Sequence, residues 1–389
     1  MAQAGRYGDD IRSDCLIEVE LGGSSLNVNV ESSVKAMFGK QIEQQVRDEC
    51  AQLGVENAQI IIKDRGALPF VISARLESAL SRAGIKIASP VWPQKNMIQT
   101  EESNKDRLRR SRLYLPGNTP HLFLNAGLHE PDGIILDLED SVAPAEKDTA
   151  RALVRNALLS VDFFAAERMV RINPLPAGLE DLEWVVPFGV HLILIPKCES
   201  AEQVQLVDEK IQKLNPDHHV WLLPIIESAR GCFAAFEIAG ASPNVVALTI
   251  GLEDYTADLG ASRTFEGQES LWARSMIINA AKSHGLQAIS SVYSDVEDMD
   301  GCFESAVAAK ALGFDGMGCI HPRQIPVVHR AFNPTPEEIA HAQAIAEAYE
   351  SAKQQGLGVV VLGNKMIDAP VVKRALAILK QAERLRVRG

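Results

Sequence analysis

Short apolar runs that end abruptly in charged or polar residues recur along the last three quarters of the chain. They read LYLPG (113–117), GIILDLED (133–140), MVRIN (169–173), LILIPK (192–197), LLPIIES (222–228), VVALTIGLED (245–254), ISSVYSD (289–295) and, more weakly, FDGMGCIHP (314–322). Amphipathic stretches with helical spacing separate the runs, and alternating strands and helices are typical of a parallel sheet. About eight repeats predict a closed (β/α)8 barrel rather than an open doubly wound sheet.

The charged ends of these runs indicate where chemistry would take place, because the carboxyl ends of barrel strands form the functional rim. They would surround one pocket and comprise Asp137, Glu139, Asp140, Arg171, Lys197, Glu227, Glu253, Asp254 and Asp295. Mg²⁺ commonly takes one or two protein carboxylates, and Glu227 with Asp254 fits that sparse arrangement. Helix capping would explain any single acid. Several acids on separate strands beside Arg171 and Lys197 favour an active site.

Other residues of the rim have roles that follow from their chemistry. Arg171 offers a fixed guanidinium fork for a carboxylate or an enolate oxygen, and it also neutralises nearby acids. Side chains alternate along a strand, so Asp137 and Glu139 should point to the same side, where one orients a water or a metal ion. His321 ends the last barrel strand and is either a substrate contact or a structural residue.

The first 85 residues follow a different pattern. Strand-like runs cover 15–21, 26–30, 57–64 and 68–76, an amphipathic helix covers 33–53, and a short helix follows at 77–84. This order predicts a small α+β domain of the form β-β-α-β-β. Residues 86–106 have the composition of a linker, so we expect the first domain to move relative to the barrel at 107–330. Residues 331–389 read as a helix from Thr335, a strand at 358–363 and a final helix at about 370–387, an extension of the barrel.

Composition excludes several classes of function. The net charge of −12 over 389 residues argues against nucleic acid as the main partner. Six scattered cysteines without a C-x-x-C pair suit reduced thiols in a cytoplasm. We see neither a secretory signal nor an apolar stretch of ~20 residues, so we expect a cytoplasmic protein without a membrane span.

The motifs of the second region together resemble a known family. RSRLYLPGN (110–118), DGIILDLEDSVAPAEKDTAR (132–151), VRIN (170–173), LIPK (194–197), IESARG (226–231), GLEDY (251–255) and IHPRQI (320–325) are similar to the beta subunit of bacterial citrate lyase, within the citryl-, malyl- and citramalyl-thioester lyases. The resemblance implies a (β/α)8 barrel, Mg²⁺ and a homotrimer or hexamer.

The same resemblance implies roles for individual residues. Glu227 and Asp254 would hold the metal, and Arg171 would stabilise the enolate. Asp368, in GNKMIDAP (363–370), would enter the site of a neighbouring subunit as the base, with Glu139 as the second candidate. Contacts with the substrate or coenzyme A are expected at Arg110, Gly117, Asp137, Lys197 and His321.

Residues 1–85 resemble the gamma subunit, or acyl carrier protein, of the same enzyme system. The matching stretches are VESSVKAMFG (30–39), LGVENAQIIIKDRGAL (53–68) and ISARLESAL (72–80). In that family a serine two residues before an aspartate carries phosphoribosyl-dephospho-coenzyme A. Here Ser13 stands directly before Asp14, with Arg12 at the expected place, and Ser13 is the attachment candidate.

Together these features predict a Mg²⁺-dependent carbon–carbon lyase that cleaves a citryl thioester to oxaloacetate and an acetyl thioester. A fused carrier would present its thioester at an effective concentration of about millimolar. The alternatives are a malyl-, methylmalyl- or citramalyl-coenzyme A lyase acting on a free thioester, and a non-catalytic scaffold that recruits an acyltransferase. A coenzyme A transferase, the alpha subunit of the system, is the expected protein partner.

Overall fold

The computed structural model describes residues 1–93, 102–214, 216–354, 360–362 and 365–388. The chain divides into two compact units, residues 1–328 and 329–389. Within the described residues, no helix has the length and apolar character that crossing a membrane requires.

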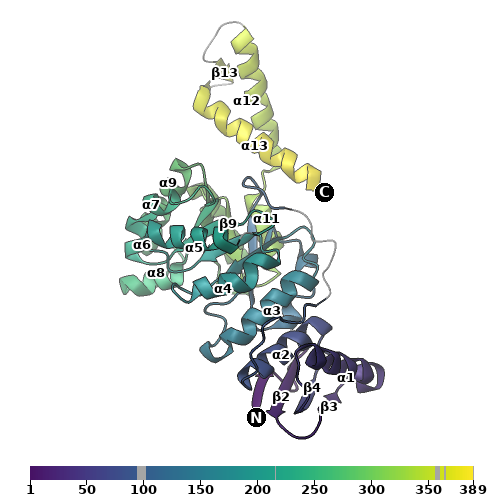
Figure 1. The fold of residues 1–389 in the computed structure, drawn as a ribbon. Coiled ribbons are helices and arrows are strands. Elements are labelled where there is room, and N and C mark those ends of the chain that lie inside the picture. Colours follow the sequence, from purple (N-terminus) through teal and green to yellow (C-terminus); the bar gives the residue numbers. More distant parts are fainter. Residues whose placement is uncertain (94–101, 215, 355–359, 363–364, 389) are drawn as a thin grey trace. The chain divides into compact units, whose positions relative to one another are not determined.

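Eight parallel strands close into a barrel, as the sequence predicts, and each expected run overlaps one of them (Figure 1). The strands are β5 (Ser111–Pro116), β6 (Gly133–Asp137), β7 (Glu167–Arg171), β8 (Leu192–Ile195), β9 (Trp221–Ile226), β10 (Ala247–Ile250), β11 (Gln287–Ser290) and β12 (Gly316–Cys319). Pairing of β12 with β5 completes the ring. Every residue of β6 and of β8 is buried, since helices cover one face and the barrel interior lies on the other.

Helices link the strands. They are α3 (Lys147–Ser160), α4 (Gly178–Val185), α5 (Ala201–Leu214), α6 (Ala229–Phe233), α7 (Ala235–Ala239), α8 (Leu252–Leu259), α9 (Leu271–Ser283), α10 (Met299–Leu312) and α11 (Gln324–Phe332), with short 3-10 turns η1 (Pro120–Leu122), η2 (Ala126–His129), η3 (Pro144–Glu146), η4 (Val186–Phe188) and η5 (Gln268–Ser270). Between β5 and β6, where a helix is expected to separate the two runs, the chain forms only the two turns η1 and η2. Helix α8 begins inside the GLED run and was not expected, because the run reads as a continuous strand end.

The N-terminal region forms a four-stranded sheet in the order β1-β2-β4-β3 with two helices. Its elements are β1 (Ala2–Gly5), β2 (Cys15–Leu21), β3 (Asn27–Ser32), α1 (Lys35–Gln52), β4 (Ala58–Asp64) and α2 (Pro69–Arg82). The strand expected at 68–76 is wrong, because these residues form the first part of α2. Pro69 occupies the first turn of that helix, a position that proline favours. Every residue from Phe70 to Leu80 is buried, so no polar face reveals the helical period.

Helix α2 packs against α3 and joins the N-terminal region to the barrel. Nη1 and Nη2 of Arg155 donate to the two oxygens of Glu77, at 2.9 and 2.5 Å. The Asn156 amide donates to the Phe70 carbonyl oxygen at 3.0 Å, and Arg82 bonds both oxygens of Asp148. The expected free movement of the first domain is therefore not what the structure shows, since the two regions share a buried interface within one compact unit. Residues 94–101 of the expected linker lie outside the described residues.

The second unit contains α12 (Pro336–Gln354), β13 (Val360–Leu362), β14 (Lys365–Ile367) and α13 (Ala369–Arg388). Strand β13 lies within the run expected at 358–363, of which residues 358, 359 and 363 lie outside the described residues. The strands pair antiparallel, and the two helices pack around a small core. The buried residues of that core are Ala342, Ile345, Ile367, Val372 and Ala375.

Candidate active site

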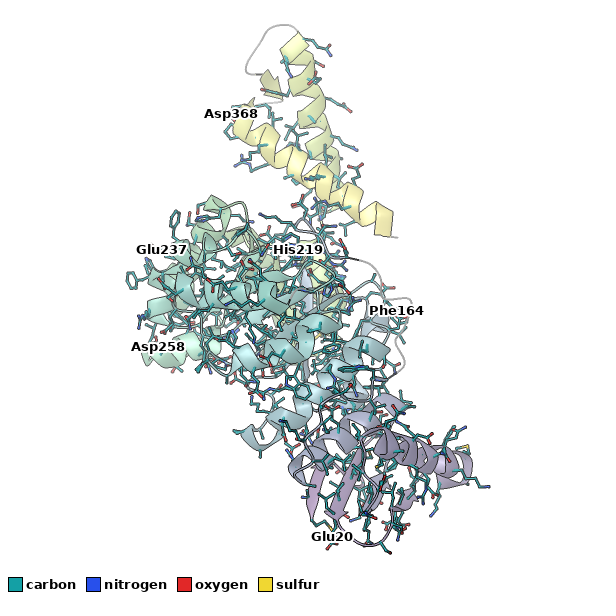
Figure 2. All side chains as sticks on the ribbon, in the orientation of Figure 1. Glu20, Phe164, His219, Glu237, Asp258 and Asp368 are labelled. Atoms are coloured by element: carbon teal, nitrogen blue, oxygen red, sulfur yellow. The ribbon has the colours of Figure 1, made fainter. Side chains whose placement is uncertain are left out.

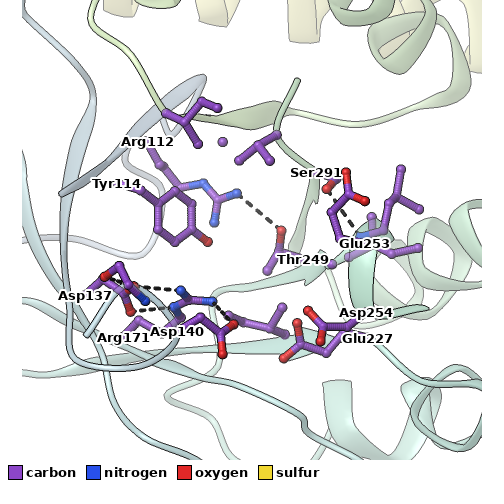
Figure 3. Close-up of a pocket in the computed structure, with 18 of the residues that line it drawn as sticks. Arg112, Tyr114, Asp137, Asp140, Arg171, Glu227, Thr249, Glu253, Asp254 and Ser291 are labelled. Carbon is purple, nitrogen blue, oxygen red and sulfur yellow. Dashed lines mark hydrogen bonds and ion pairs between the residues drawn. The ribbon is translucent and has the colours of Figure 1, made fainter. Parts of the chain in front are cut away.

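A cavity of about 490 Å³ opens among the carboxyl ends of the barrel strands (Figure 3). Inward side chains of β5 line one wall, and residues at the ends of β6, β7, β9 and β10 line the others. The charged lining residues are Arg112, Asp137, Asp140, Arg171, Glu227, Glu253 and Asp254. The barrel thus brings together residues that are far apart in the sequence.

Arg171, the last residue of β7, is fixed by two carboxylates. Its Nε and Nη2 atoms donate to the two oxygens of Asp137 at 2.7 Å, a bidentate pair, and Nη1 lies 2.7 Å from Glu139 Oε2. Burial lowers the pKa of Arg171, but the bonds to Asp137 outweigh it and hold that pKa above its ordinary value. Burial likewise raises the pKa of Asp137, and the bonds from Arg171 reverse the effect. Arg171 therefore stays a cation with a fixed orientation.

Glu227 follows β9 and is buried, at 5% exposure. The Lys197 backbone N–H donates to its Oε1 at 2.6 Å. Gly251 makes room for its other oxygen, because a Cβ at Gly251 would come 2.5 Å from Glu227 Oε2. Burial raises the pKa of Glu227 to about 8, and the negative charges of Glu139 and Asp254 contribute. The negative charge of Glu227, Glu139 and Asp254 together is greater than the positive charge that Arg171 supplies beside them.

Asp254 lies in the first turn of α8 and lines the cavity with Glu227 (Figure 3). Two carboxylates beside open space form a donor set that suits Mg²⁺, which keeps several ligand positions for water and substrate. The described residues contain no cluster of three or more His, Cys, Asp or Glu that could hold a metal ion, so a bound ion would need such outside ligands. The raised pKa of Glu227 fits a site whose missing charge is a cation.

Lys197 lies beside the cavity rather than in its wall. Its backbone has a φ of 49°, which turns the chain so that its N–H faces Glu227. Its Nζ lies 3.2 Å from Glu139 and 3.7 Å from Asp140. Lys197 and Arg171 therefore share the acidic residues that follow β6.

The structure does not bring Arg110 to the pocket. It precedes β5, at the amino end of the barrel, and forms a buried pair with Asp132, with Nε and Nη2 each 2.8 Å from an Asp132 oxygen. The motif placed Arg110 near the site because it is close in sequence, but the strand carries it to the opposite end. Asp295 also does not line the cavity and instead accepts bonds from Glu297 and Asp298 backbone N–H groups.

Of the remaining predicted residues, Gly117 and His321 lie near the rim, and Asp368 lies in the second unit. Gly117 follows β5 and donates its N–H to the Asp137 carbonyl oxygen at 2.8 Å. His321 directly follows Ile320, which lines the cavity, and its Nδ1 accepts from the Arg323 N–H. Asp368 belongs to the second unit, where its carboxylate accepts from the Val371 N–H at the start of α13 (Figure 2). Its role at the barrel stays a prediction.

Sequence reasoning missed several lining residues, among them Arg112, Tyr114 and Thr249. The Tyr114 ring lies under the Arg171 guanidinium, with 5.4 Å from Cζ to the ring centre. The signal was present in the strand period, because residues 112, 114 and 116 share the inward face of β5.

Ser13 lies in the loop before β2 and is half-buried. Its φ is 52°, and its N–H donates to the Arg65 carbonyl oxygen at 2.9 Å. The next residue, Asp14, is buried and receives two bonds of 2.9 Å from Arg75. Arg75 in turn donates to the Asn118 carbonyl oxygen at 3.2 Å, in the segment that follows β5. This chain of contacts connects the Ser13 loop to the rim side of the barrel.

A closed barrel whose acidic residues and clamped arginine face one cavity has the architecture of a barrel enzyme with its site at the carboxyl ends of the strands. Residues 110–322 match the family described as HpcH/HpaI aldolase/citrate lyase, and residues 2–83 match an acyl carrier family described as malonate decarboxylase delta subunit (MdcD). The chain belongs to the HpcH/HpaI aldolase/citrate lyase family and carries an acyl-carrier-like domain in front of the barrel.

Several relatives are similar over most of their own length. Citrate lyase subunit beta of Escherichia coli K12 is 40% identical over 289 residues, which cover 72% of this chain and 96% of that protein. Mitochondrial citramalyl-CoA lyase of Rattus norvegicus is 35% identical, over 70% of this chain and 86% of that protein. Protein CitE of Mycobacterium tuberculosis, solved with magnesium, acetoacetate and coenzyme A, is 34% identical with a TM-score of 0.60, over 72% of this chain and 100% of that one.

Proposed function

We propose that the barrel cleaves a citryl thioester, a 3-hydroxy-3-carboxyacyl thioester, into oxaloacetate and an acetyl thioester. The observation that carries this proposal is that Arg171, oriented by Asp137, faces the same cavity as the carboxylates of Glu227 and Asp254. A rigid cation such as Arg171 can stabilise an enolate. An acidic pair that binds a metal ion can stabilise an alkoxide. The similarity to citrate lyase beta subunits and to the magnesium-bound CitE supports the assignment.

Each charged residue then has a task in the cleavage. Mg²⁺ held by Glu227 and Asp254 would lower the pKa of the substrate hydroxyl, the ordinary effect of a Lewis acid. A base accepts the hydroxyl proton, and the hydroxyl oxygen becomes the carbonyl of oxaloacetate. The bonding electron pair passes to the thioester as an enolate, which takes up a proton to give the acetyl group. Arg171 donates hydrogen bonds to the developing enolate oxygen.

The base has two candidates. Asp368 of a neighbouring subunit is the first, within a homotrimer or hexamer, and Glu139 is the second. Burial raises the pKa of Glu139 although Arg171 and Lys197 oppose the shift, and a raised pKa suits a proton acceptor near neutrality. However, Glu139 is already paired with Arg171 and Lys197, which favours Asp368.

The fused carrier supports a bound rather than a free thioester. The half-buried Ser13, whose N–H donates to the Arg65 carbonyl oxygen and whose neighbour Asp14 is held by Arg75, fits a modification site, and the domain matches an acyl carrier family. Ser13 would carry a phosphoribosyl-dephospho-coenzyme A arm, which a separate coenzyme A transferase subunit would load. Intact-mass measurement of the purified protein tests this point, because a nucleotide arm on Ser13 adds a defined mass that Ser13→Ala removes.

A second candidate function is citramalyl- or malyl-coenzyme A lyase, favoured by the 35% identity to the rat enzyme. Citryl-, citramalyl- and malyl-thioesters should therefore be assayed in parallel, with and without Mg²⁺. We expect cleavage only with Mg²⁺ and fastest for the citryl compound. Cleavage of none of them, with Mg²⁺ still bound, would instead favour the scaffold that recruits an acyltransferase.

A further inference from the structure

Arg112 lines the cavity from near the amino end of β5, away from the rim. It is the second residue of β5 and shares the inward face of the strand with Tyr114 and Pro116, all three of which line the cavity. The side chain is 1% exposed. Its Nη2 donates to the Thr249 hydroxyl at 3.2 Å, and that hydroxyl donates to the Ile289 carbonyl oxygen at 3.0 Å (Figure 3).

Arg112 lacks the counter-charge that other deeply buried arginines have. Arg75, Arg109 and Arg155 are equally buried, and each pairs with a carboxylate, of Asp14, Glu167 and Glu77 respectively. In the described part of the chain, Nε and Nη1 of Arg112 are buried without any hydrogen-bond partner. A buried charge that is left unpaired is costly, so a partner from outside the protein is the expected complement.

The nearby charges do not satisfy Arg112. Glu167 lies close enough to affect it, but its two oxygens already accept from Arg109, at 2.7 and 2.8 Å, and one of them also accepts from Ser103. Burial lowers the pKa of Arg112, the direction expected of a cation without a counter-ion. Nε and Nη1 lie on different edges of the planar guanidinium, and each can donate to a carboxylate oxygen.

The depth of Arg112 separates its site from the carboxylate pair. Glu227 directly follows β9 and Asp254 lies beyond the end of β10, so both belong to the rim. Arg112 lies four residues before Pro116 in β5. Pro116 pairs in register with Asp137 at the end of β6, so Arg112 lies deeper in the barrel than the rim. A molecule bound by Glu227 and Asp254 at the rim therefore has Arg112 below it in the same cavity.

We propose that Arg112 binds a second carboxylate of the substrate and so selects a thioester whose hydroxyl-bearing carbon carries a carboxymethyl group. This inference rests on the proposed function. A citryl thioester has such a group, whereas a citramalyl thioester has a methyl group and a malyl thioester a hydrogen at that position. Cleavage of the first leaves oxaloacetate, and cleavage of the second leaves pyruvate. Arg112 is thus a specificity residue, and the hydroxyl and its adjacent carboxylate are recognised at the rim in every case.

Calorimetric titration with oxaloacetate and pyruvate in the presence of Mg²⁺ tests the proposal on the whole chain. Both products have the same 2-oxo acid group, and only oxaloacetate has the additional carboxylate. We expect the wild-type protein to bind oxaloacetate at least tenfold more tightly than pyruvate. Arg112→Met should weaken oxaloacetate binding about tenfold to hundredfold, the range for a hydrogen bond to a charged group, and leave pyruvate binding within twofold.

The outcomes distinguish a failure of the proposed lyase function from a failure of the role assigned to Arg112. If neither product binds the wild type with Mg²⁺, the proposed function fails together with the role of Arg112. If oxaloacetate binds but Arg112→Met weakens both products equally or neither, Arg112 is not a specificity residue while the lyase proposal stands. Arg112→Lys keeps the positive charge but removes the planar guanidinium, so it should retain part of the preference for oxaloacetate over pyruvate. It provides a second test if Arg112→Met does not fold. The kcat/KM ratio for citryl over citramalyl thioester should fall in parallel.

Discussion

At the scale of single residues, Arg171 shows how the site is prepared in advance. Three of its nitrogens are held by Asp137 and Glu139, which leaves the remaining N–H bonds of the guanidinium for a ligand in the cavity. A donor that does not have to reorient during the reaction contributes more to catalysis than a mobile one. Its neighbours therefore matter as much as its charge.

Arg171→Lys keeps the positive charge but removes the bidentate bond with Asp137. We expect kcat for thioester cleavage to fall about 10²–10³-fold, the usual effect of losing a preorganised donor. Steady-state kinetics with saturating Mg²⁺ measures this. Arg151→Lys is the matched control, because Arg151 also pairs with two carboxylates, of Asp181 and Glu180, but outside the cavity. Equal activity of the two variants would remove Arg171 from the mechanism.

Glu49 makes stability depend on pH in the N-terminal region. Burial raises its pKa from the usual value of 4.5, although bonds from Ser73 and Gln45 oppose the shift. A carboxyl group with a raised folded-state pKa stabilises fully below pH 4.5, and this contribution is lost as pH rises through the folded-state pKa. The melting temperature of Glu49→Gln minus that of the wild type should thus increase as pH rises above 4.5. Glu20→Gln, an exposed change in β2 of the same N-terminal region (Figure 2), should show no such trend, and a flat difference for Glu49→Gln would contradict the prediction.

The residues that the sequence predicted well are those at strand ends. Arg171, Glu227 and Asp254 follow apolar runs, so the rule that parallel strands end at one rim brings them together. Arg112 escaped that rule because it lies near the start of β5, before the apolar run at 113–117, and not at the end of its strand. Arg110 shows the opposite error, because a motif residue was assigned to the site although it precedes its strand.

At the scale of elements, the turn between β10 and α8 shapes the proposed metal site. Gly251 ends the strand segment, and its missing side chain is what allows Glu227 to reach its position. Helix α8 then begins and places Asp254 in its first turn, where a carboxylate is favoured by the helix dipole. The periodicity of the run does not predict this helix, because VVALTIGLED remains apolar almost up to the turn.

Gly251→Ala should weaken Mg²⁺ binding at least tenfold, because the added Cβ would come 2.5 Å from Glu227 Oε2 and displace the carboxylate. Titration calorimetry with Mg²⁺ alone measures the affinity without any need for turnover. Gly8→Ala serves as the control, since its added Cβ would make only an ordinary contact, at 3.6 Å from Ile11. Unchanged affinity in Gly251→Ala would mean that Glu227 is not a ligand.

Helix α2 marks the limit of pattern reading at this scale. Its buried positions run without interruption from Phe70 to Leu80, since the sheet of its own domain lies on one side and α3 on the other. An element covered on all sides has no polar face, so its period cannot be recognised before the packing is known. Linker composition alone led to the expectation that the first domain moves freely, because the contact between α2 and α3 cannot be read from the sequence.

At the scale of the whole molecule, the interface between α2 and α3 joins carrier-like domain and barrel into one unit. The pair between Glu77 and Arg155 is at its centre, with side chains 9% and 2% exposed. Removal of one partner of a buried pair is strongly destabilising, because the other charge is left uncompensated.

Arg155→Met should lower the free energy of unfolding by about 3–5 kcal/mol, measured by urea unfolding of the full chain. The double variant Glu77→Leu with Arg155→Met should recover most of that loss, since it leaves no orphan charge in the interface. Additive losses in the double variant would show that the two side chains act independently. Glu56→Gln, an exposed change in the same domain, should alter stability little.

If Ser13 carries the acyl arm as proposed, the contacts from Asp14 through Arg75 to Asn118 hold its loop beside the barrel of the same polypeptide, and we expect each arm to serve that barrel. Hybrid assemblies would reveal this ownership. A protomer that lacks Ser13, mixed with one that lacks Arg171, should not restore turnover of carrier-bound substrate, because the intact arm and the intact barrel would never belong to the same polypeptide. Fusion in one gene would then do more than guarantee equal amounts of the two parts, since it would supply each barrel with a thioester from its own chain.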